Sequence, residues 1–228
     1  MTSYRTNAES ETQLLLPRIW YFSTFVVALT GAILGLIETF SSAEFGQNPL
    51  FSLGNYIGYF TNINAWLMVI ISAMLTLHPM RKGGRLWPSL RLFSVVSATV
   101  VWFIQNFILN YVPGHQPPQG LGVISDPAVH IIGPLMVMLG WLLFSSRRLN
   151  RLANVPALLI IPIIYLAYTV WRGITINWFP YPIVDADVLG WPQTVLNIAL
   201  VGLLFLILGY IYFFFDQVLS RFKRKSIN

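Results

Sequence analysis

Cysteine and charge are what this sequence lacks. None of the 228 residues is cysteine, which excludes disulfides and thiolate metal sites. Only 10% of the residues are charged, whereas a typical soluble domain has about 25%. Charge this scarce does not cover the surface of a soluble protein, and a hydrophobic content of 56% excludes a disordered chain. The composition therefore predicts an integral membrane protein.

Six long apolar segments hold most of the hydrophobic residues, and each is close to the length of about 20 residues that a helix needs to cross a bilayer. The connections between them are too short for a soluble domain. We therefore expect an all-α bundle of six transmembrane helices that forms one domain over residues 18–217. The expected spans are 18–40, 54–77, 90–110, 127–146, 152–172 and 192–217.

The basic residues predict the orientation of the bundle. Thirteen of the 14 flank the same ends of the expected spans, so the positive-inside rule places both the segment 1–17 and the basic tail 218–228 in the cytoplasm. These residues are Arg5, Arg18, Arg81, Lys82, Arg85, Arg91, Arg147, Arg148, Arg151, Arg221, Lys223, Arg224 and Lys225. The net charge of +6 is then a topology signal, and we expect membrane lipids rather than nucleic acid as partners.

The expected location is a bacterial cytoplasmic (inner) membrane, because the chain is compact and shows no targeting extension. Gly31 and Gly35 form a GxxxG pair, which is more typical here of helix packing within the chain than of a dimer face. The oligomeric state is left open.

Polar side chains within the spans gather near the outer ends, opposite the basic loops. They are Glu38, Thr61, Asn62, Asn64, Gln105, Asn106, His130, Arg172 and Asn197. Polar groups inside a bilayer are costly and usually face the bundle interior or a wet cavity. Their common depth on all six spans predicts a polar chamber that opens toward the outer face or the outer leaflet.

Thr61 and His130 are the candidates for chemistry. His130 is the only histidine within a span. Pro134, four residues later, has no N–H to donate to the carbonyl of His130, which predicts a kink in the helix there. A membrane threonine usually bonds to its own backbone, but beside a histidine base it becomes a nucleophile. The alternative for His130 is a packing hydrogen bond between helices. The two residues lie at similar depth and can meet if their helices are neighbours.

Other polar groups suggest roles around this pair. The amides of Asn62, Asn64 and Asn106 can stabilise an oxyanion, and Asn64 shares a helical face with Thr61. Arg172 is the only base at the outer ends and suits a carboxylate or phosphate. Its competing interpretation is an internal pair with Glu38, Asp185 or Asp187.

No cofactor is expected. The spans contain no lysine for a retinal Schiff base, only one histidine for a haem iron, and no recognisable zinc-ligand spacing.

Three short motifs resemble those of a known family. YFTNIN lies at 59–64, HxxxP at 130–134 and RG…WFPYPIVD at 172–185. In content and order they are similar to the six-transmembrane proteins related to the androgen-induced protein and the androgen-dependent regulator of tissue factor pathway inhibitor. The resemblance covers roughly residues 18–217. Asn62 and Asn64 depart from it, because animal members have more apolar or acidic residues there.

Characterised animal members of that family are threonine hydrolases that cleave fatty acid esters of hydroxy fatty acids. The resemblance implies Thr61 as the nucleophile and His130 as the essential histidine. It also places Tyr181 in the family's aromatic–Tyr–Pro stretch and Asp185 at the acidic position that follows.

Two hypotheses follow from the sequence. In the first, a lipid-ester hydrolase uses Thr61 and His130, Asn64 or Asn106 stabilises the oxyanion, and Arg172 holds a carboxylate head of the amphipathic substrate. Glu38, Tyr181 and Asp185 are further candidates for substrate contact. In the second, a non-enzymatic transporter or lipid-binding protein uses the outward-facing chamber as a binding site. A Thr61 hydroxyl within hydrogen-bond reach of His130 favours the first.

Overall fold

The computed structural model describes residues 2–41, 48–84, 86–113, 116–146 and 152–225, and within these ranges it is helical and contains no strand. Six helical stretches are long and apolar enough to cross a membrane, which confirms the predicted all-α class and the number of spans. They are Leu14–Ser41, Phe60–Leu77, Trp87–Tyr111, Gly122–Phe144, Pro156–Ile176 and Trp191–Arg221.

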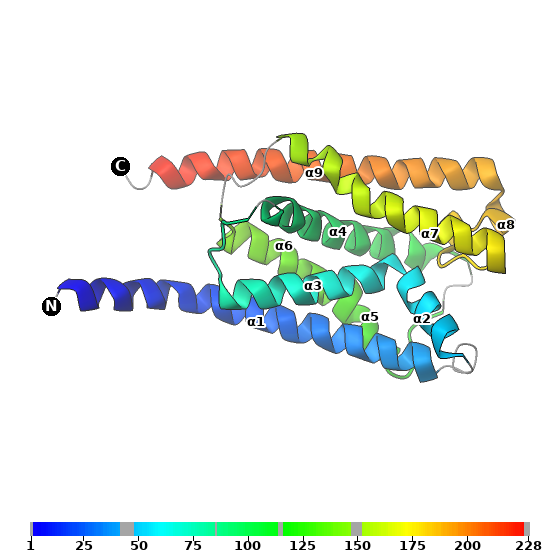
Figure 1. The fold of residues 1–228 in the computed structure, drawn as a ribbon, viewed down its shortest axis with the longest axis horizontal. Coiled ribbons are helices and arrows are strands. Elements are labelled where there is room, and N and C mark those ends of the chain that lie inside the picture. The colour runs from blue at the N-terminus through cyan, green and yellow to red at the C-terminus, as the bar shows by residue number, and fades with distance from the viewer. Residues whose placement is uncertain (1, 42–47, 85, 114–115, 147–151, 226–228) are drawn as a thin grey trace.

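The third and fifth spans include a short 3₁₀ helix, Leu109–Tyr111 and Pro156–Leu159. Most spans otherwise consist of one long α-helix, and these helices run roughly along the long axis of the molecule (Figure 1). They are α1 (Thr2–Ser41), α3 (Phe60–Leu77), α4 (Trp87–Phe107), α7 (Ile160–Ile176) and α9 (Trp191–Lys225). The fourth span is composite: α5 (Gly122–Pro127), a π-helical turn (Ala128–Ile132) and α6 (Gly133–Phe144). The short helices α2 (Pro49–Gly58) and α8 (Ala186–Leu189) lie at one end of the bundle, opposite the beginning of α1 and the end of α9. We call this end the α2 end.

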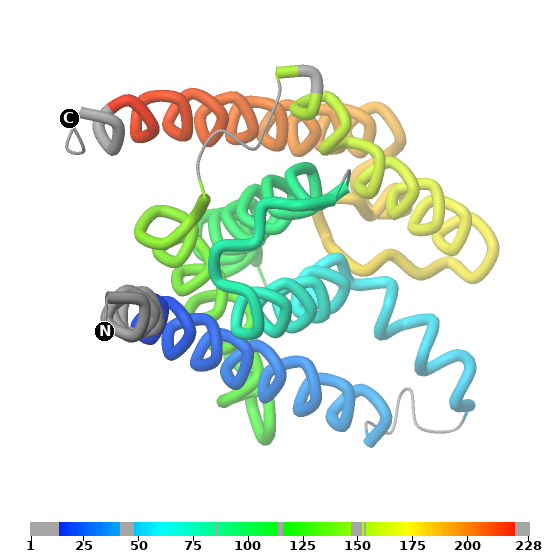
Figure 2. The backbone as a smooth tube through the Cα atoms, turned by 60° about the vertical axis from the view of Figure 1, so that its left-hand side comes forward, coloured from blue at the N-terminus to red at the C-terminus, as the bar shows by residue number. Residues whose placement is uncertain are grey.

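The centre of the bundle is α4, which packs against α3, α6 and α9. Figure 2 shows α1 and α9 on opposite sides of the molecule, with α4 and α6 between them. The core is built from fully buried apolar side chains, among them Met68, Leu92, Val96 and Phe205. Large apolar side chains on α9 such as Leu203 are exposed, as expected for a helix that faces lipid.

The predicted second span, 54–77, is wrong at its beginning. Residues 54–58 belong to α2, and extended backbone at Tyr59 (φ −89°, ψ 119°) separates α2 from α3. Asn48 starts α2 by accepting hydrogen bonds from two backbone N–H groups of its first turn, with Pro49 at the first helical position. As a result, Thr61 lies in the first turn of α3 instead of inside a continuous helix.

Other boundaries also differ from the sequence-based spans. The fourth span begins at Gly122, so Asp126 is helical instead of lying in the loop predicted at 111–126. The fifth continues to Ile176, where Asn177 ends it in the left-handed region (φ 51°).

Helix α9 passes through residue 217 without a break and ends at Lys225. The basic residues Arg85, Arg147, Arg148 and Arg151 lie outside the described residues.

Candidate active site

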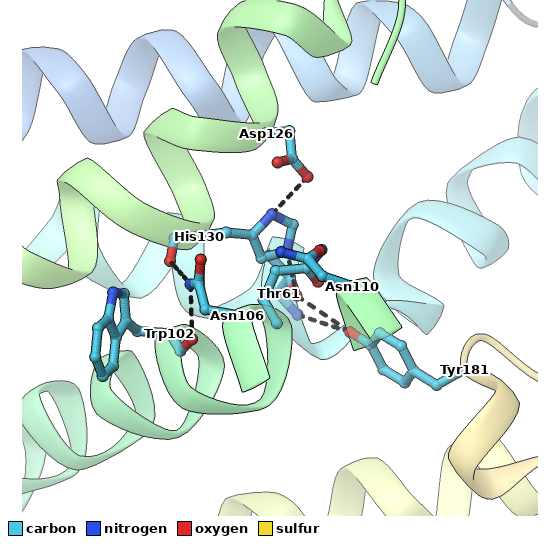
Figure 3. Close-up of polar contacts among 8 residues, drawn as sticks. Thr61, Trp102, Asn106, Asn110, Asp126, His130 and Tyr181 are labelled. Carbon is cyan, nitrogen blue, oxygen red and sulfur yellow. Dashed lines mark hydrogen bonds and ion pairs between the residues drawn. The ribbon is translucent and has the colours of Figure 1, made fainter. Parts of the chain in front are cut away.

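Thr61 is held at the start of α3 with its side chain pointing into the bundle, 8% exposed. Backbone N–H groups in the first turn of a helix have no partner within the helix. The N–H of Thr61 instead donates to Tyr181 Oη at 3.2 Å. Thr61 Oγ1 lies 3.2 Å from the same Tyr181 oxygen and 3.3 Å from His130 Nε2 (Figure 3). The nucleophile and histidine expected from the sequence are therefore in contact.

His130 lies on the π-helical turn, whose wider winding depends on two residues that follow it. The N–H of Gly133 donates to the carbonyl of Ala128, five residues back, and a Cβ on Gly133 would lie only 2.6 Å from that oxygen. Pro134 has no N–H for the carbonyl of His130. The Asn106 amide donates to that carbonyl at 3.4 Å and to the Trp102 carbonyl at 2.8 Å. The local distortion expected at Pro134 is thus present as this turn.

Helix α1 packs closely against the same turn. A Cβ on Gly31 would lie 2.6 Å from Val129 Cγ1 and 2.9 Å from Ala128 Cβ. The glycine therefore allows α1 to approach the turn that carries His130. This contact supports the interpretation of Gly31 as a residue of packing within the chain.

Asp126 completes a chain of three side chains. It lies one helical turn before His130, and its Oδ1 is 2.8 Å from His130 Nδ1. The geometry at Nδ1 is not that of a well-directed hydrogen bond, so the contact with Asp126 is mainly electrostatic. Sequence reasoning left Asp126 out of the site because it placed the residue in a loop. The D-x-x-x-H spacing, which puts both side chains on one helical face, was the signal that could have found it.

One placement of protons satisfies these contacts together. Thr61 N–H donates to Tyr181 Oη, and the Tyr181 hydroxyl donates to Thr61 Oγ1. The Thr61 hydroxyl then donates to His130 Nε2, and the ring proton is on Nδ1, beside Asp126. Nε2 is in this arrangement an unprotonated base directed at the threonine hydroxyl.

Tyr181 comes from the segment between α7 and α8, and its ring packs edge-on against Tyr59 at 5.5 Å. Burial raises the pKa of Tyr181 to about 12, although its hydrogen bonds with Thr61 act in the opposite direction. The phenol is therefore protonated at neutral pH and remains a hydrogen-bond donor beside Thr61.

Two cavities meet at this cluster. The polar cavity, about 500 Å³, is lined by Glu38, Asn62, Asp126 and His130 among others. The apolar cavity, about 90 Å³, lies between α4, α7 and α9 and is lined by side chains such as Val101, Leu166 and Phe205. Four residues line both cavities: Thr61, Gln105, Leu109 and Tyr181. The threonine thus lies at the boundary between a polar and an apolar space.

The other residues expected at the site divide between the cavity and the scaffold. Asn62 and Glu38 line the polar cavity, with the Asn62 amide donating to the Tyr56 carbonyl at 2.8 Å. Asn64 is buried away from the cavities and accepts a hydrogen bond from Ser97 at 2.8 Å, which joins α3 to α4.

Asn106 and Asp185 also belong to the scaffold. Asn106 supports the π-helical turn, and Asp185 caps α8 by accepting from the Asp187 and Val188 N–H groups. Gln105 lines both cavities but was expected only as one of the polar residues at this depth.

Arg172 is not brought to Thr61. It is 5% exposed, donates to Asn55 Oδ1, and is surrounded by aromatic rings, the closest being Trp178 at 4.6 Å. Neither cavity is lined by it. Within the described part of the chain it also forms no ion pair with Glu38, Asp185 or Asp187. Its surroundings are those of a cation stabilised by ring faces.

No family model, curated protein or solved structure matches the chain. Among the residues that the structure describes, no group of three or more histidine, aspartate and glutamate side chains is placed to hold a metal ion. What the site does is therefore inferred from its own geometry.

Proposed function

We propose that this protein is a membrane-embedded hydrolase of lipid esters, with Thr61 as nucleophile and His130 as general base. The main support is the contact of Thr61 Oγ1 with His130 Nε2 at 3.3 Å, while the second ring nitrogen lies 2.8 Å from Asp126. A hydroxyl nucleophile, a base and a group that orients the base is the arrangement that acyl transfer requires. A separation slightly beyond the ideal is common before substrate binds.

In the first half of the reaction, Thr61 Oγ1 attacks the carbonyl carbon of the ester while its proton moves to His130 Nε2. The carbonyl oxygen becomes an oxyanion. When the tetrahedral intermediate collapses, the bond to the alcohol oxygen breaks, and His130 returns the proton to the departing alcohol. The acyl group remains on Thr61 as a new ester.

In the second half, water enters from the polar cavity, which His130 lines. His130 takes a proton from this water as it attacks the acyl-threonine carbonyl. Collapse of the second tetrahedral intermediate returns the proton to Thr61 Oγ1 and releases the fatty acid. The net reaction is one ester and one water giving one acid and one alcohol.

The oxyanion is stabilised by Tyr181 and by the start of α3. The protonated Tyr181 hydroxyl lies 3.2 Å from Thr61 Oγ1 and can turn toward an adjacent oxyanion. The positive end of the α3 dipole lies at the same place, since Thr61 is in its first turn. These groups replace the Asn64 and Asn106 amides that the sequence suggested for this role.

The two cavities support an amphipathic ester as substrate. The apolar cavity between α4, α7 and α9 can take the part of an acyl chain next to the ester group, and the alcohol part can enter the polar cavity. Fatty acid esters of hydroxy fatty acids, which the motifs suggest, are one class of such esters.

We also propose that the beginning of α1 and the end of α9 are cytoplasmic. Thirteen of the 14 lysine and arginine residues flank that side of the spans, as the positive-inside rule requires. In a bacterial inner membrane the polar cavity, at the α2 end, then lies toward the outer side.

Turnover of an uncharged fatty acyl ester by the purified full-length protein in detergent tests the hydrolase assignment. Release of free fatty acid is expected, and both Thr61→Ala and His130→Ala should lower kcat by about 10³-fold or more, because each removes a reacting group.

The matched control is Thr175→Ala. This substitution removes an exposed hydroxyl that donates a hydrogen bond to the Trp171 carbonyl within α7. The variant should keep wild-type turnover. Hydrolysis by Thr61→Ala at the wild-type rate would contradict the assignment, as would a wild-type protein that binds the ester and leaves it intact.

A further inference from the structure

The described lining of the polar cavity contains two carboxyl groups but no lysine or arginine, and its histidine, His130, lies against Asp126. The two carboxyl groups belong to Glu38 and Asp126. Glu38 projects from the end of α1 toward α5, where a Cβ on Gly122 would lie only 3.1 Å from its Oε1. Two helices from different parts of the chain therefore bring carboxyl groups to the same space.

Arg172, the only arginine or lysine near these ends of the spans, does not compensate the charge of the two carboxyl groups. Arg172 lines neither cavity, and its guanidinium is held by Asn55 and the Trp178 ring. Glycine at 54 and 58 leaves room for the guanidinium there, since Cβ atoms at these positions would lie 3.5 and 3.2 Å from its atoms. The Arg172 side chain is thus held at a place separate from the polar cavity.

The two side-chain amides of the polar cavity each direct one N–H at a protein acceptor. The Gln105 amide donates to Asn110 Oδ1 at 2.8 Å, and the Asn62 amide donates to the Tyr56 carbonyl at 2.8 Å. Asp126 lies against His130, so a carboxylate that entered the cavity would meet the Glu38 carboxyl group with no lysine or arginine beside it among the described residues. Hydroxyl or ammonium groups would instead find carboxyl oxygens that accept hydrogen bonds.

From this distribution of charge we propose that the site selects esters whose alcohol part is uncharged or cationic and discriminates against alcohol parts that bear a carboxylate. The alcohol part occupies the polar cavity beside Glu38 and Asp126, and the acyl chain begins in the apolar cavity. This selectivity rests on the proposed hydrolase activity and narrows it. An ester of a hydroxy fatty acid with a free carboxylate is then a poor substrate, whereas its methyl ester and a monoacylglycerol are good ones.

A matched pair of substrates tests this selectivity. The oleoyl ester of a hydroxy fatty acid and the methyl ester of the same compound differ in one charge and share the scissile bond. We expect the kcat/KM of the full-length protein in neutral detergent micelles to be about tenfold higher for the methyl ester, because like charges a few ångströms apart repel in a poorly solvated site. Mono-oleoylglycerol and oleoylcholine should be cleaved at least as well as the methyl ester.

The ratio between the two esters is then measured in variants, so that any loss of turnover common to both cancels. Glu38→Gln should lower the ratio about threefold or more, and Glu38→Lys should reverse it. Asp187→Asn is the matched control. It removes an exposed acid from α8, outside both cavities, and should leave the ratio unchanged.

The outcomes separate the selectivity from the activity. Equal cleavage of both esters, a preference for the free carboxylate, or a ratio that Glu38→Lys does not move would overturn the selectivity and leave the hydrolase intact. If none of the four esters is cleaved, the proposed hydrolase activity fails and the selectivity fails with it.

Discussion

In the proposed mechanism, Asp126 keeps the imidazole proton of His130 on the nitrogen that faces away from Thr61. Its carboxyl group lies 2.8 Å from Nδ1, so a proton on Nδ1 is stabilised there and Nε2 remains free to accept the threonine proton. The charge also stabilises the imidazolium that forms during attack. Asp126 acts through His130 and is a positioning residue in this account.

Asp126→Asn should therefore lower kcat by about 10²-fold, with a smaller change in KM, because the amide can favour the wrong tautomer. Steady-state kinetics with an uncharged ester measures both constants. Asp126→Glu should recover part of the loss, and the exposed Asp187→Asn should behave like the wild type. Equal kcat values for wild type and Asp126→Asn would exclude a role for the carboxyl group.

Tyr181→Phe removes the phenol that lies 3.2 Å from Thr61 Oγ1 while keeping the ring packed against Tyr59. Loss of one oxyanion donor lowers kcat by about 10²-fold in related chemistry, and we expect a similar loss here. Labelling of Thr61 by an acyl-transfer inhibitor should slow in parallel. Unchanged kcat would place the oxyanion elsewhere.

The raised pKa of Tyr181 also predicts how stability depends on pH. The folded protein keeps this proton up to about pH 12, whereas a phenol in the unfolded chain loses it near pH 10. The contribution of the protonated Tyr181 to the free energy of unfolding is fully present below pH 10 and is lost as pH rises through 12. Between pH 8 and 11.5 the Tm of the wild type in detergent should therefore fall more than that of Tyr181→Phe. Equal falls would contradict this burial.

At the scale of elements, the π-helical turn within the fourth span is what points His130 toward α3. Its winding needs a residue without a side chain at position 133, since a Cβ there would lie 2.6 Å from the Ala128 carbonyl oxygen and 3.3 Å from Met68 Cε. The first of these neighbours is backbone and cannot turn aside. The turn therefore couples the stability of the fold to the position of the base.

Gly133→Ala should lower both the Tm and kcat, because relief of the clash must shift the turn that carries His130. A loss of about 1–3 kcal/mol is typical of overpacking and corresponds to a Tm lower by several degrees in a chain of this length. Gly202→Ala in α9 is the matched control, since a Cβ there meets nothing within 4 Å. It should leave activity unchanged and keep or raise the Tm. An active Gly133→Ala protein of wild-type Tm would show that the turn does not need this glycine.

The elements also show what the sequence could and could not predict. Length and hydropathy are local properties, so the six spans followed from them. The break at Tyr59 did not, because 54–77 is one apolar run and the break depends on Trp178 packing against Gly58 from a distant segment. The enclosure of Arg172 by rings from three segments, Phe51, Tyr168 and Trp178, was hidden for the same reason.

The residues of the site divide in the same way. Thr61 and His130 were predicted from residue type, depth and motif, and their contact was left conditional on which helices are neighbours. The structure supplies that condition, since the π-helical turn packs against both α1 and α3. Asp126 was missed because a helix boundary was placed five residues too late. The separation of Asn64 and Asn106 from the cavities depends on side-chain partners that sequence spacing does not specify.

At the scale of the whole molecule, the beginning of α1 and the end of α9 lie at the same end (Figure 1). The residues that line the polar cavity lie at the α2 end. The positive-inside rule then predicts which end faces which compartment. Because the chain contains no cysteine, single introduced cysteines report this directly. Gln119 and Lys82 are exposed positions at the two ends.

In intact bacterial cells that express the protein, a membrane-impermeant maleimide should label Gln119→Cys. Lys82→Cys should react only after the membrane is opened. The wild type, which has no thiol, is the control for background labelling. The reverse pattern would invert the orientation and place the cavity toward the cytoplasm.

The nucleophilic role of Thr61 is tested most directly by covalent labelling. A fluorophosphonate forms a stable adduct with an activated hydroxyl, and digestion followed by mass spectrometry locates it. We predict one adduct, on the peptide that contains Thr61, which is strongly reduced in His130→Ala, lost in Thr61→Ala and retained in Thr175→Ala. Labelling of full strength in Thr61→Ala would contradict the assignment of Thr61 as the nucleophile.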